Sequence, residues 1–205
     1  MLSPKQLQLL EAWKKNLFQE LSIAEIMKIS GKKTKTWVFN TIKLLVKQGL
    51  LSSIRKGNVD IYRLNLQNQF LVQTLHYLEI QNYLNFLQLR IIEETINTIP
   101  IKTYCLLVFG SYAEGKQKKN SDLDICFLVE DKMKEKKIKP YVNDIKLQFS
   151  TVIDDHYITF DDFIKMLLHH EENVGKQIAR KHILFYNADI YYQLIKEAHK
   201  HGFRP

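Results

Sequence analysis

The sequence predicts an α+β protein with a small helical domain at its N-terminus and a second domain that contains strands and helices. Three observations lead to this prediction. Apolar residues recur at helical spacing in residues 1–49 and again in residues 67–98. Short apolar runs that are typical of strands follow each of these segments. The chain has 205 residues and 45% hydrophobic content, enough for two small cores. The expected domains are residues 1–66 and 100–205, joined by a connecting helix at 67–99.

The composition excludes several classes of protein. The longest apolar runs, Tyr104–Phe109 and Ile125–Val129, are far shorter than the roughly 20 residues of a membrane-spanning helix. Met1 leads into a polar helix without a signal-peptide pattern, so we expect a cytoplasmic protein without membrane partners. Cys105 and Cys126 lie in apolar runs and belong to no CxxC or Cys/His cluster, so we expect buried, reduced thiols and no zinc site.

The net charge of +8 is concentrated near the N-terminus. Residues 1–66 hold 12 Lys and Arg against 4 Asp and Glu, whereas residues 67–205 hold 18 of each. A small domain with this excess attracts polyanions, because binding releases their condensed counterions. DNA or RNA is therefore the first partner to consider, and general solubility is the alternative explanation of the charge.

Three short helices are expected before residue 50. The first follows Ser3, a good N-cap residue that precedes a proline. The second follows Ser22, which has the spacing of a capping box with Glu25. The third starts near Lys33 and stops at Gly49. Three short helices in this order indicate a helix-turn-helix arrangement.

A β-hairpin is expected directly after these helices. The runs Leu50–Ile54 and Val59–Leu64 have strand character, and Gly57-Asn58 between them suits a tight turn. The whole arrangement resembles a winged helix-turn-helix domain, whose third helix enters the major groove of DNA. The resemblance implies nucleic-acid contacts by Lys32, Lys33, Thr34, Lys35, Thr36, Arg55 and Lys56. Winged helices also serve as protein-docking or dimerisation modules, and this alternative stays open.

The segment at residues 67–98 contains neither glycine nor proline. Its apolar residues fit one or two helices: Leu71, Leu75, Leu78, Tyr83, Leu87, Ile91 and Ile92. Pro100 ends the run. We expect this segment to join the domains and to pack against the second one, although the same face could form the interface of an oligomer.

Two aspartates mark the start of a strand in the second domain. An apolar run ends in Gly110-Ser111, and a basic loop leads from there to Ser121 and then to Asp122-Leu123-Asp124. Side chains alternate along a strand, so Asp122 and Asp124 are expected to project to the same face. Two adjacent carboxylates repel each other unless a cation lies between them. Mg²⁺ or Mn²⁺ fits best, because these ions accept oxygen ligands and also bridge nucleotide phosphates.

The glycine and serine before the aspartates complete a specific motif. Gly110 lets backbone approach a phosphate closely, and Ser111 can donate hydrogen bonds to triphosphate oxygens. The pattern GSxAxGxxxxxSDxD at residues 110–124 resembles the signature of the polymerase β nucleotidyltransferase superfamily, especially its minimal nucleotidyltransferase branch. The resemblance implies a polymerase β-like mixed sheet flanked by helices. It also implies nucleotide binding by Gly110, Ser111 and Ser121, and metal binding by Asp122 and Asp124.

The resemblance further implies a third carboxylate, on a later strand, that binds the catalytic metal and activates the acceptor hydroxyl. A strand is expected at Lys146–Thr159, and it contains Asp154-Asp155. Adjacent residues point to opposite faces, so only one of the two can join the first pair. Counting back from the turn at Thr159–Phe163 favours Asp155. Two alternatives stay open: that Asp154 is the third carboxylate, or that neither aspartate is. The histidines match no metal-ligand spacing and are expected to be surface or packing residues: His156, His169 and His170.

The reaction implied by the resemblance is transfer of a nucleoside monophosphate from an NTP to a hydroxyl, with release of pyrophosphate. This is nucleotidyltransferase chemistry of EC class 2.7.7, with Asp122, Asp124 and Asp155 as catalytic residues and ATP as the favoured donor. The sequence leaves open whether the acceptor is a partner protein, a nucleic acid or a small molecule. The alternative hypothesis is a DNA-binding transcription regulator whose second domain senses nucleotide without turnover.

Overall fold

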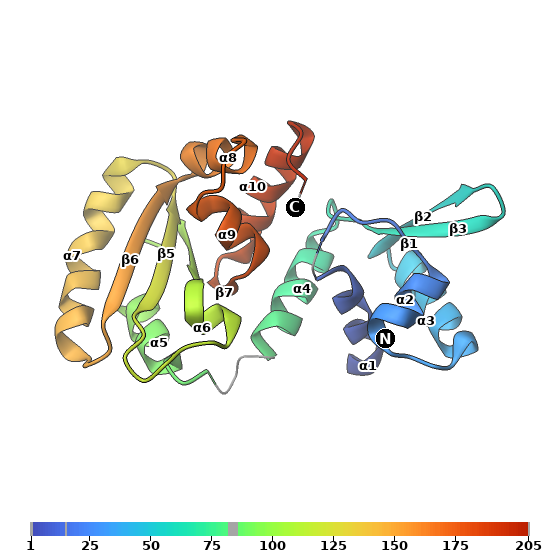
Figure 1. Cartoon of the computed structure of the whole chain (residues 1–205), viewed down its shortest axis with the longest axis horizontal. Coiled ribbons are helices and arrows are strands. Elements are labelled where there is room, and N and C mark those ends of the chain that lie inside the picture. The colour runs from blue at the N-terminus through green and yellow to red at the C-terminus, as the bar shows by residue number, and fades with distance from the viewer. Residues whose placement is uncertain (1, 15, 82–85, 205) are drawn as a thin grey trace. The chain divides into compact units, whose positions relative to one another are not determined.

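The computed structural model describes residues 2–14, 16–81 and 86–204, and the chain divides into two compact units, Met1–Leu78 and Glu79–Pro205 (Figure 1). We call them the N-terminal unit and the C-terminal unit. Tyr83, an apolar position of the expected connecting helix, lies outside the described residues. Among the described helices, none is both long enough and apolar enough to cross a membrane.

The N-terminal unit combines short helices with a three-stranded antiparallel sheet of order β1-β3-β2. The predicted hairpin is present, because β2 and β3 pair on either side of Gly57-Asn58. The elements are α1 (Pro4–Leu7), the 3₁₀ helix η1 (Gln8–Trp13), β1 (Leu21–Ser22), α2 (Ile23–Ser30), α3 (Lys35–Lys47), β2 (Leu51–Lys56) and β3 (Val59–Leu64). The helix α4 (Gln69–Gln81) follows them along the chain.

The local signals for these helices are confirmed. Ser3 and Ser22 both accept the backbone hydrogen bond of a capping box. Gly49, the residue after the C-cap of α3, has a φ of 71°, which ends the helix in the left-handed region. The first helix differs from the prediction in two respects: it continues after Leu7 as the 3₁₀ helix η1, and it ends at Trp13, before Leu17 and Phe18, whose apolar spacing predicts a longer helix. The buried core of these elements contains Leu9, Leu10, Trp13, Ile26, Val38, Ile42 and Leu45.

The C-terminal unit is built on a mixed four-stranded sheet of order β6-β5-β4-β7. The strands β5 and β6 are parallel, and the other pairs are antiparallel. The elements are α5 (Leu89–Thr98), β4 (Tyr104–Val108), α6 (Gly110–Glu114), β5 (Leu123–Val129), α7 (Lys132–Gln148), β6 (Ile153–Thr159), α8 (Phe160–Leu168), α9 (Val174–Arg180), β7 (Ile183–Tyr186) and α10 (Ala188–Lys200). The α+β class and the mixed sheet flanked by helices are therefore confirmed.

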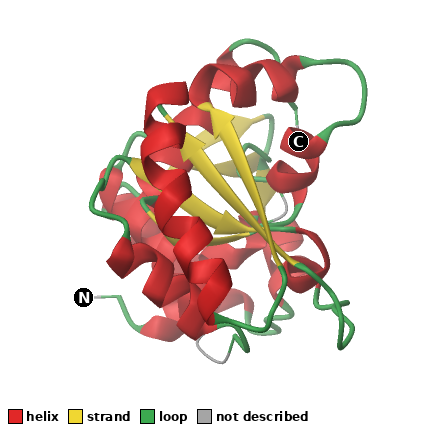
Figure 2. Cartoon of the chain, turned by 90° about the vertical axis from the view of Figure 1, so that its left-hand side faces the viewer, coloured by secondary structure: helices red, strands yellow, loops and turns green. Residues whose placement is uncertain are grey.

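Helices cover both faces of this sheet (Figure 2). On one face, Ile125 and Phe127 of β5 pack with residues of α5 and α7 in a continuous core. On the other face, α8 contacts β5 and β6, and α10 contacts β4. Cys105 and Cys126 alternate with the residues of the first face, and both are free and buried, as predicted. The face on which a strand residue lies therefore decides which helices it meets.

The segment before β6 departs from the prediction. The sequence pattern predicts a strand from Lys146, but β6 begins only at Ile153, and Lys146 belongs to α7. The charged stretch Lys132–Lys139 forms the first half of α7. This helix persists because its buried residues recur at helical spacing: Ile138, Val142 and Ile145.

Candidate active site

The junction between β4 and α6 brings Gly110 against a carboxylate. The amide of Phe109 donates a hydrogen bond of 3.1 Å to the carbonyl of Asp124, which holds the end of β4 beside the start of β5. Gly110 has a φ of 65°, in the left-handed region that favours glycine. A Cβ at this position would lie 2.0 Å from Oδ2 of Asp124. Both the backbone conformation and the packed carboxylate therefore require glycine here.

The two aspartates of the motif have different environments. Asp124 lies within β5 and is partly buried, whereas Asp122 precedes the strand and is exposed. Burial raises the pKa of Asp124 above its ordinary value, and the negative charges of Asp154 and Asp122 raise it further, while His156 lowers it. The carboxyl group of Asp124 thus lies in a region of concentrated negative charge.

The register between β5 and β6 decides which later carboxylate joins Asp124. Asp154 lies opposite Asp124, and Asp155 lies opposite Ile125 of the α5 and α7 core. Because side chains alternate along both strands, Asp154 shares the face of Asp124 and Asp155 points to the opposite face. The ion pair between Asp155 and Lys146 of α7 agrees with this orientation.

The sequence-based preference for Asp155 is therefore corrected, because the structure brings Asp154 and not Asp155 to Asp124. The reason is physical. Local spacing shows that two adjacent residues face opposite ways, but only the pairing with a neighbouring strand shows which of them faces a given partner.

His156 lies beside these carboxylates, a position that sequence reasoning missed. It follows Asp154 by two residues along β6, and its Nε2 lies 3.1 Å from Oδ2 of Asp154. Its ring makes a T-shaped contact with that of Phe109, with an interplanar angle of 72° and ring centroids 5.1 Å apart. One potential ligand atom from each of Asp124, Asp154 and His156 lies within 4.8 Å of the other two. We call these three residues the carboxylate–histidine cluster. The overlooked signal is the alternation Asp-x-His, which puts both side chains on one face of a strand.

The other two histidines are not part of this cluster. His169 and His170 are exposed and lie between α8 and α9. The nitrogen Nδ1 of His169 accepts a hydrogen bond of 3.1 Å from the amide of Glu171, a local contact.

The donor set of the cluster fits a divalent cation. In the described part of the chain, no lysine or arginine forms an ion pair with Asp122, Asp124 or Asp154. Neighbouring carboxylates without a cationic partner repel each other, and a bound divalent ion relieves that repulsion. Carboxylate oxygens are also the ligands that Mg²⁺ and Mn²⁺ accept most readily. The residues present therefore suit such an ion.

Ser111 and Ser121 lie at the two ends of the loop that joins α6 to β5. Ser111 is partly exposed in the first turn of α6. The hydroxyl of Ser121 accepts a hydrogen bond of 2.8 Å from the amide of Lys118, and the amide of Ser121 donates one of 3.1 Å to the carbonyl of Lys118. Ser121 thus closes a turn directly before Asp122. Nucleotide contacts by the two serines stay a prediction.

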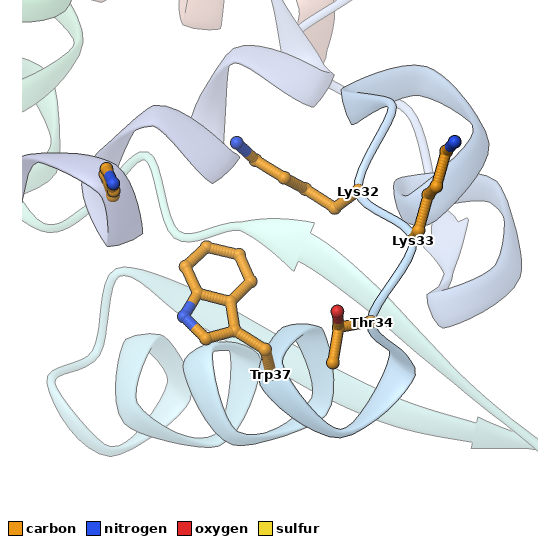
Figure 3. Close-up of a pocket in the computed structure, with 5 residues that line it drawn as sticks. Lys32, Lys33, Thr34 and Trp37 are labelled. Carbon is orange, nitrogen blue, oxygen red and sulfur yellow. The ribbon is translucent and has the colours of Figure 1, made fainter.

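A second candidate site lies in the N-terminal unit, at the loop between α2 and α3. Lys32, Lys33, Thr34 and Trp37 line a hollow of about 160 Å³ together with Lys5 of α1 (Figure 3). The ammonium nitrogen of Lys32 lies 5.8 Å from the centre of the Trp37 ring, a cation–π distance. Sequence reasoning missed Lys5, because nothing local links α1 to a loop about 30 residues later.

The predicted nucleic-acid contacts fall into two groups. Within the described residues, Lys32, Lys33 and Lys35 form no ion pair. The basic residues of the hairpin do have acidic partners: Arg55 pairs with Asp60 at 3.1 Å, and Lys56 pairs with Glu20. The positive charge of the α2–α3 loop is therefore available to a ligand, whereas that of the hairpin is partly compensated within the unit.

Comparison with known proteins gives a family match within the C-terminal unit and a similar solved structure. Residues 91–191 match the family model described as polymerase beta, nucleotidyltransferase. A solved structure described as the crystal structure of the toxin-antitoxin with AMP-PNP is similar at 19% sequence identity over 55% of this chain and 86% of that chain, with a TM-score of 0.38. No curated protein matches the chain significantly. The segment that matches the family model contains Gly110, Asp122, Asp124 and the remaining members of the carboxylate–histidine cluster.

Proposed function

We propose, on the premise that residues 91–191 fall within the nucleotidyltransferase superfamily, that this protein transfers a nucleoside monophosphate from an NTP to a hydroxyl and releases pyrophosphate. The match supports transferase chemistry in general, and the nature of the transferred group is our inference. AMP from ATP is the favoured group, and Mg²⁺ or Mn²⁺ is the favoured cofactor.

One arrangement carries the proposal: Asp124 and Asp154 face each other across parallel strands while Gly110 packs against Asp124. Nucleotidyl transfer needs oxygen ligands for a cation and, next to them, backbone that phosphates can approach closely. A pair of aspartates with a purely structural role would be expected to have a lysine or arginine partner. Asp155 has such a partner in Lys146, whereas Asp124 and Asp154 have no lysine or arginine partner among the described residues.

In the proposed reaction, the acceptor oxygen attacks the α-phosphorus in line, and the bond from that phosphorus to the bridging oxygen breaks. Asp154 accepts the proton of the acceptor hydroxyl, and pyrophosphate leaves. Gly110 and Ser111 bind the β- and γ-phosphates through backbone amides and the serine hydroxyl. A divalent cation held by Asp122, Asp124 and Asp154 would offset the negative charge of the phosphate oxygens.

We also propose that the N-terminal unit is a winged helix that contacts nucleic acid. The order of α2, α3 and the β2–β3 hairpin agrees with that family, and this unit carries the net positive charge of the chain. The proposed main contacts are Lys32, Lys33 and Lys35, because they have no acidic partners among the described residues. Arg55 and Lys56 are proposed as weaker contacts. A nucleic acid, or a protein bound to one, is then the favoured acceptor.

A labelling experiment tests the transferase proposal. The full chain is incubated with Mg²⁺ or Mn²⁺, each NTP labelled at the α-phosphate, and an extract of host cells. The products are then digested with ribonuclease, deoxyribonuclease or protease. We expect label that disappears with one of these digestions and that is absent for the Asp122→Asn/Asp124→Asn variant. The Asp144→Asn variant, altered at an exposed position of α7, serves as the matched control and should label normally.

Failure would have a clear meaning. Labelling by the wild type no stronger than by the double variant, with nucleotide still bound, would contradict the transferase and favour a regulator that senses nucleotide without turnover. Label that resists all three digestions would instead indicate a small-molecule acceptor.

A further inference from the structure

His156 is the one member of the carboxylate–histidine cluster to which the proposed reaction gives no task. It lies on the same face of β6 as Asp154, and its side chain is 35% exposed, so it is accessible to a ligand. The edge-on contact with Phe109 limits rotation of the imidazole ring. Phe109 in turn is fixed by its backbone hydrogen bond to Asp124. The histidine is therefore held by the same junction that positions Gly110.

The spacing of the cluster suits a single ion. Ligand atoms about 2.1 Å from one cation lie roughly 3 to 4.3 Å from each other, depending on the angle between them. The three potential ligand atoms lie within 4.8 Å of one another, so small side-chain adjustments would allow all three to reach one ion. The nitrogen of His156 that faces the carboxylates is Nε2.

We propose that His156 is a metal ligand, and that its nitrogen makes the site selective for a first-row transition-metal ion over Mg²⁺. This inference rests on the proposed function only in assuming that the cluster binds a divalent cation. Mg²⁺ is a hard ion that prefers oxygen ligands and gives up water reluctantly. Imidazole nitrogen favours transition-metal ions, in an order that rises from Mn²⁺ to Co²⁺. One nitrogen among carboxylate oxygens therefore shifts the preference of the site away from Mg²⁺.

A positioning role is the competing explanation. In that case His156 only donates a hydrogen bond from Nε2 to Oδ2 of Asp154 and orients that carboxylate. The two roles differ in one measurable respect. Loss of an orienting hydrogen bond weakens every divalent ion similarly, whereas loss of a nitrogen ligand weakens Mn²⁺ and Co²⁺ much more than Mg²⁺.

The test measures metal binding directly on the metal-free full chain, without any requirement for turnover. Affinities for Mg²⁺, Mn²⁺ and Co²⁺ are measured by calorimetry, Mn²⁺ binding also by electron paramagnetic resonance, and the ligands of Co²⁺ by its visible absorption. For His156→Ala we expect roughly tenfold or greater loss of Mn²⁺ and Co²⁺ affinity, with Mg²⁺ affinity changed less than about threefold. The Co²⁺ spectrum should change as a nitrogen ligand is lost.

Two further variants make the result interpretable. His156→Gln keeps a hydrogen-bond donor for Asp154 but removes the nitrogen ligand, so it should lose Mn²⁺ and Co²⁺ affinity as His156→Ala does, whereas a positioning role predicts that it keeps the wild-type affinities. His170→Ala, at an exposed histidine outside the cluster, should behave as wild type. Urea unfolding of the metal-free variants checks that each is folded.

Equal losses for all three ions, or an unchanged Co²⁺ spectrum, would overturn the inference in favour of a positioning role or none. The outcome is independent of the labelling experiment. Selective loss of Mn²⁺ and Co²⁺ in a protein that transfers no label would support the metal site while the proposed function fails. Label transfer that needs Asp124, together with metal affinities unaffected by substitution of His156, would support the proposed function while the inference about His156 fails.

Discussion

Two separate constraints act on Gly110: its left-handed backbone conformation and its contact with Asp124. Comparison with Gly115, which shares only the first constraint, distinguishes them. Gly110 and Gly115 both have φ near 70° (65° and 70°), but a Cβ at Gly115 would meet nothing within 4 Å. A side chain at either position costs about 1 kcal/mol in the left-handed conformation. Only at Gly110 would it also displace the carboxylate of Asp124.

Gly110→Ala is therefore expected to lower the free energy of unfolding by at least about 1 kcal/mol more than Gly115→Ala does. It should also abolish metal binding, because the new methyl group occupies the place of the carboxylate. Urea unfolding and Mn²⁺ titration measure the two effects. Equal effects of the two substitutions would show that the contact with Asp124 is unimportant.

The raised pKa of Asp124 predicts a conflict between stability and function. Because its pKa in the folded state lies above the ordinary value, ionising this carboxyl at neutral pH destabilises the metal-free folded protein. Below the pKa of the unfolded state the group is protonated in both states and contributes nothing. Asp124→Asn should therefore raise the Tm of metal-free protein at pH 7, and the gain should shrink as pH falls through the raised folded-state pKa.

Added metal should make the wild type more stable than Asp124→Asn, the reverse of the order expected for the metal-free proteins. A divalent ion that binds only the folded state stabilises it by mass action, so Mn²⁺ should raise the Tm of the wild type far more than that of Asp124→Asn. Thermal unfolding with EDTA and with Mn²⁺ measures both effects. A variant that is less stable than the wild type in EDTA at pH 7 would contradict the argument.

At the scale of elements, β6 presents two adjacent aspartates to different surroundings. Asp154 is exposed beside Asp124, whereas Asp155 is largely buried and paired with Lys146 of α7. Asp154 thus belongs to the carboxylate–histidine cluster, and Asp155 links β6 to α7 through its ion pair with Lys146. The parallel pairing with β5 fixes this division.

Substitutions at the two positions should have opposite consequences. Asp155→Asn removes the partner of Lys146, so we expect a loss of about 1–3 kcal/mol in the free energy of unfolding with metal binding retained. Asp154→Asn should change stability by less than about 0.5 kcal/mol but abolish metal binding and label transfer. Urea unfolding measures the stability of both variants, and Mn²⁺ titration measures their metal binding. Loss of metal binding in Asp155→Asn alone would restore the assignment favoured by the sequence.

Much of the fold at this scale is predictable from local sequence. The helix starts at Ser3 and Ser22 and the stop at Gly49 are confirmed, because caps depend on neighbouring residues only. The start of β6 is not predictable in the same way. The residues from Lys146 onward have mixed character, and burial of one face of α7 against the sheet decides that they continue the helix.

At the scale of the whole molecule, the net positive charge belongs entirely to the N-terminal unit. Residues 1–66 hold 12 basic and 4 acidic residues, and residues 67–78 add no Lys, Arg, Asp or Glu. The N-terminal unit therefore has the same counts. The C-terminal unit is balanced, with 18 of each. Binding of a polyanion should therefore depend on the N-terminal unit and weaken as salt is added.

The full chain is expected to bind labelled duplex DNA or RNA with an affinity that falls steeply with salt concentration. Substituting Lys32, Lys33 and Lys35 by glutamine should reduce the slope of log K against log salt by about 2–3, near 0.9 for each lost phosphate contact. The double variant Arg55→Gln/Lys56→Gln should reduce it less, because both residues already have acidic partners. Fluorescence anisotropy at several salt concentrations measures the slopes. An equal or larger effect of the hairpin variant would contradict this ranking, and no binding at low salt would favour a protein-docking role.

The sequence by itself determined the α+β class, the helix caps, the hairpin, the buried thiols and the glycine-serine-aspartate motif around Gly110 and Asp124. These features follow from residues close together in the chain, whose preferences act locally. Only the tertiary structure decided that Asp154 rather than Asp155 meets Asp124, that His156 joins them, and that Lys5 reaches the α2–α3 loop. Each of these depends on which distant segments pair, and strand register and side-chain partners are set by burial across the whole unit.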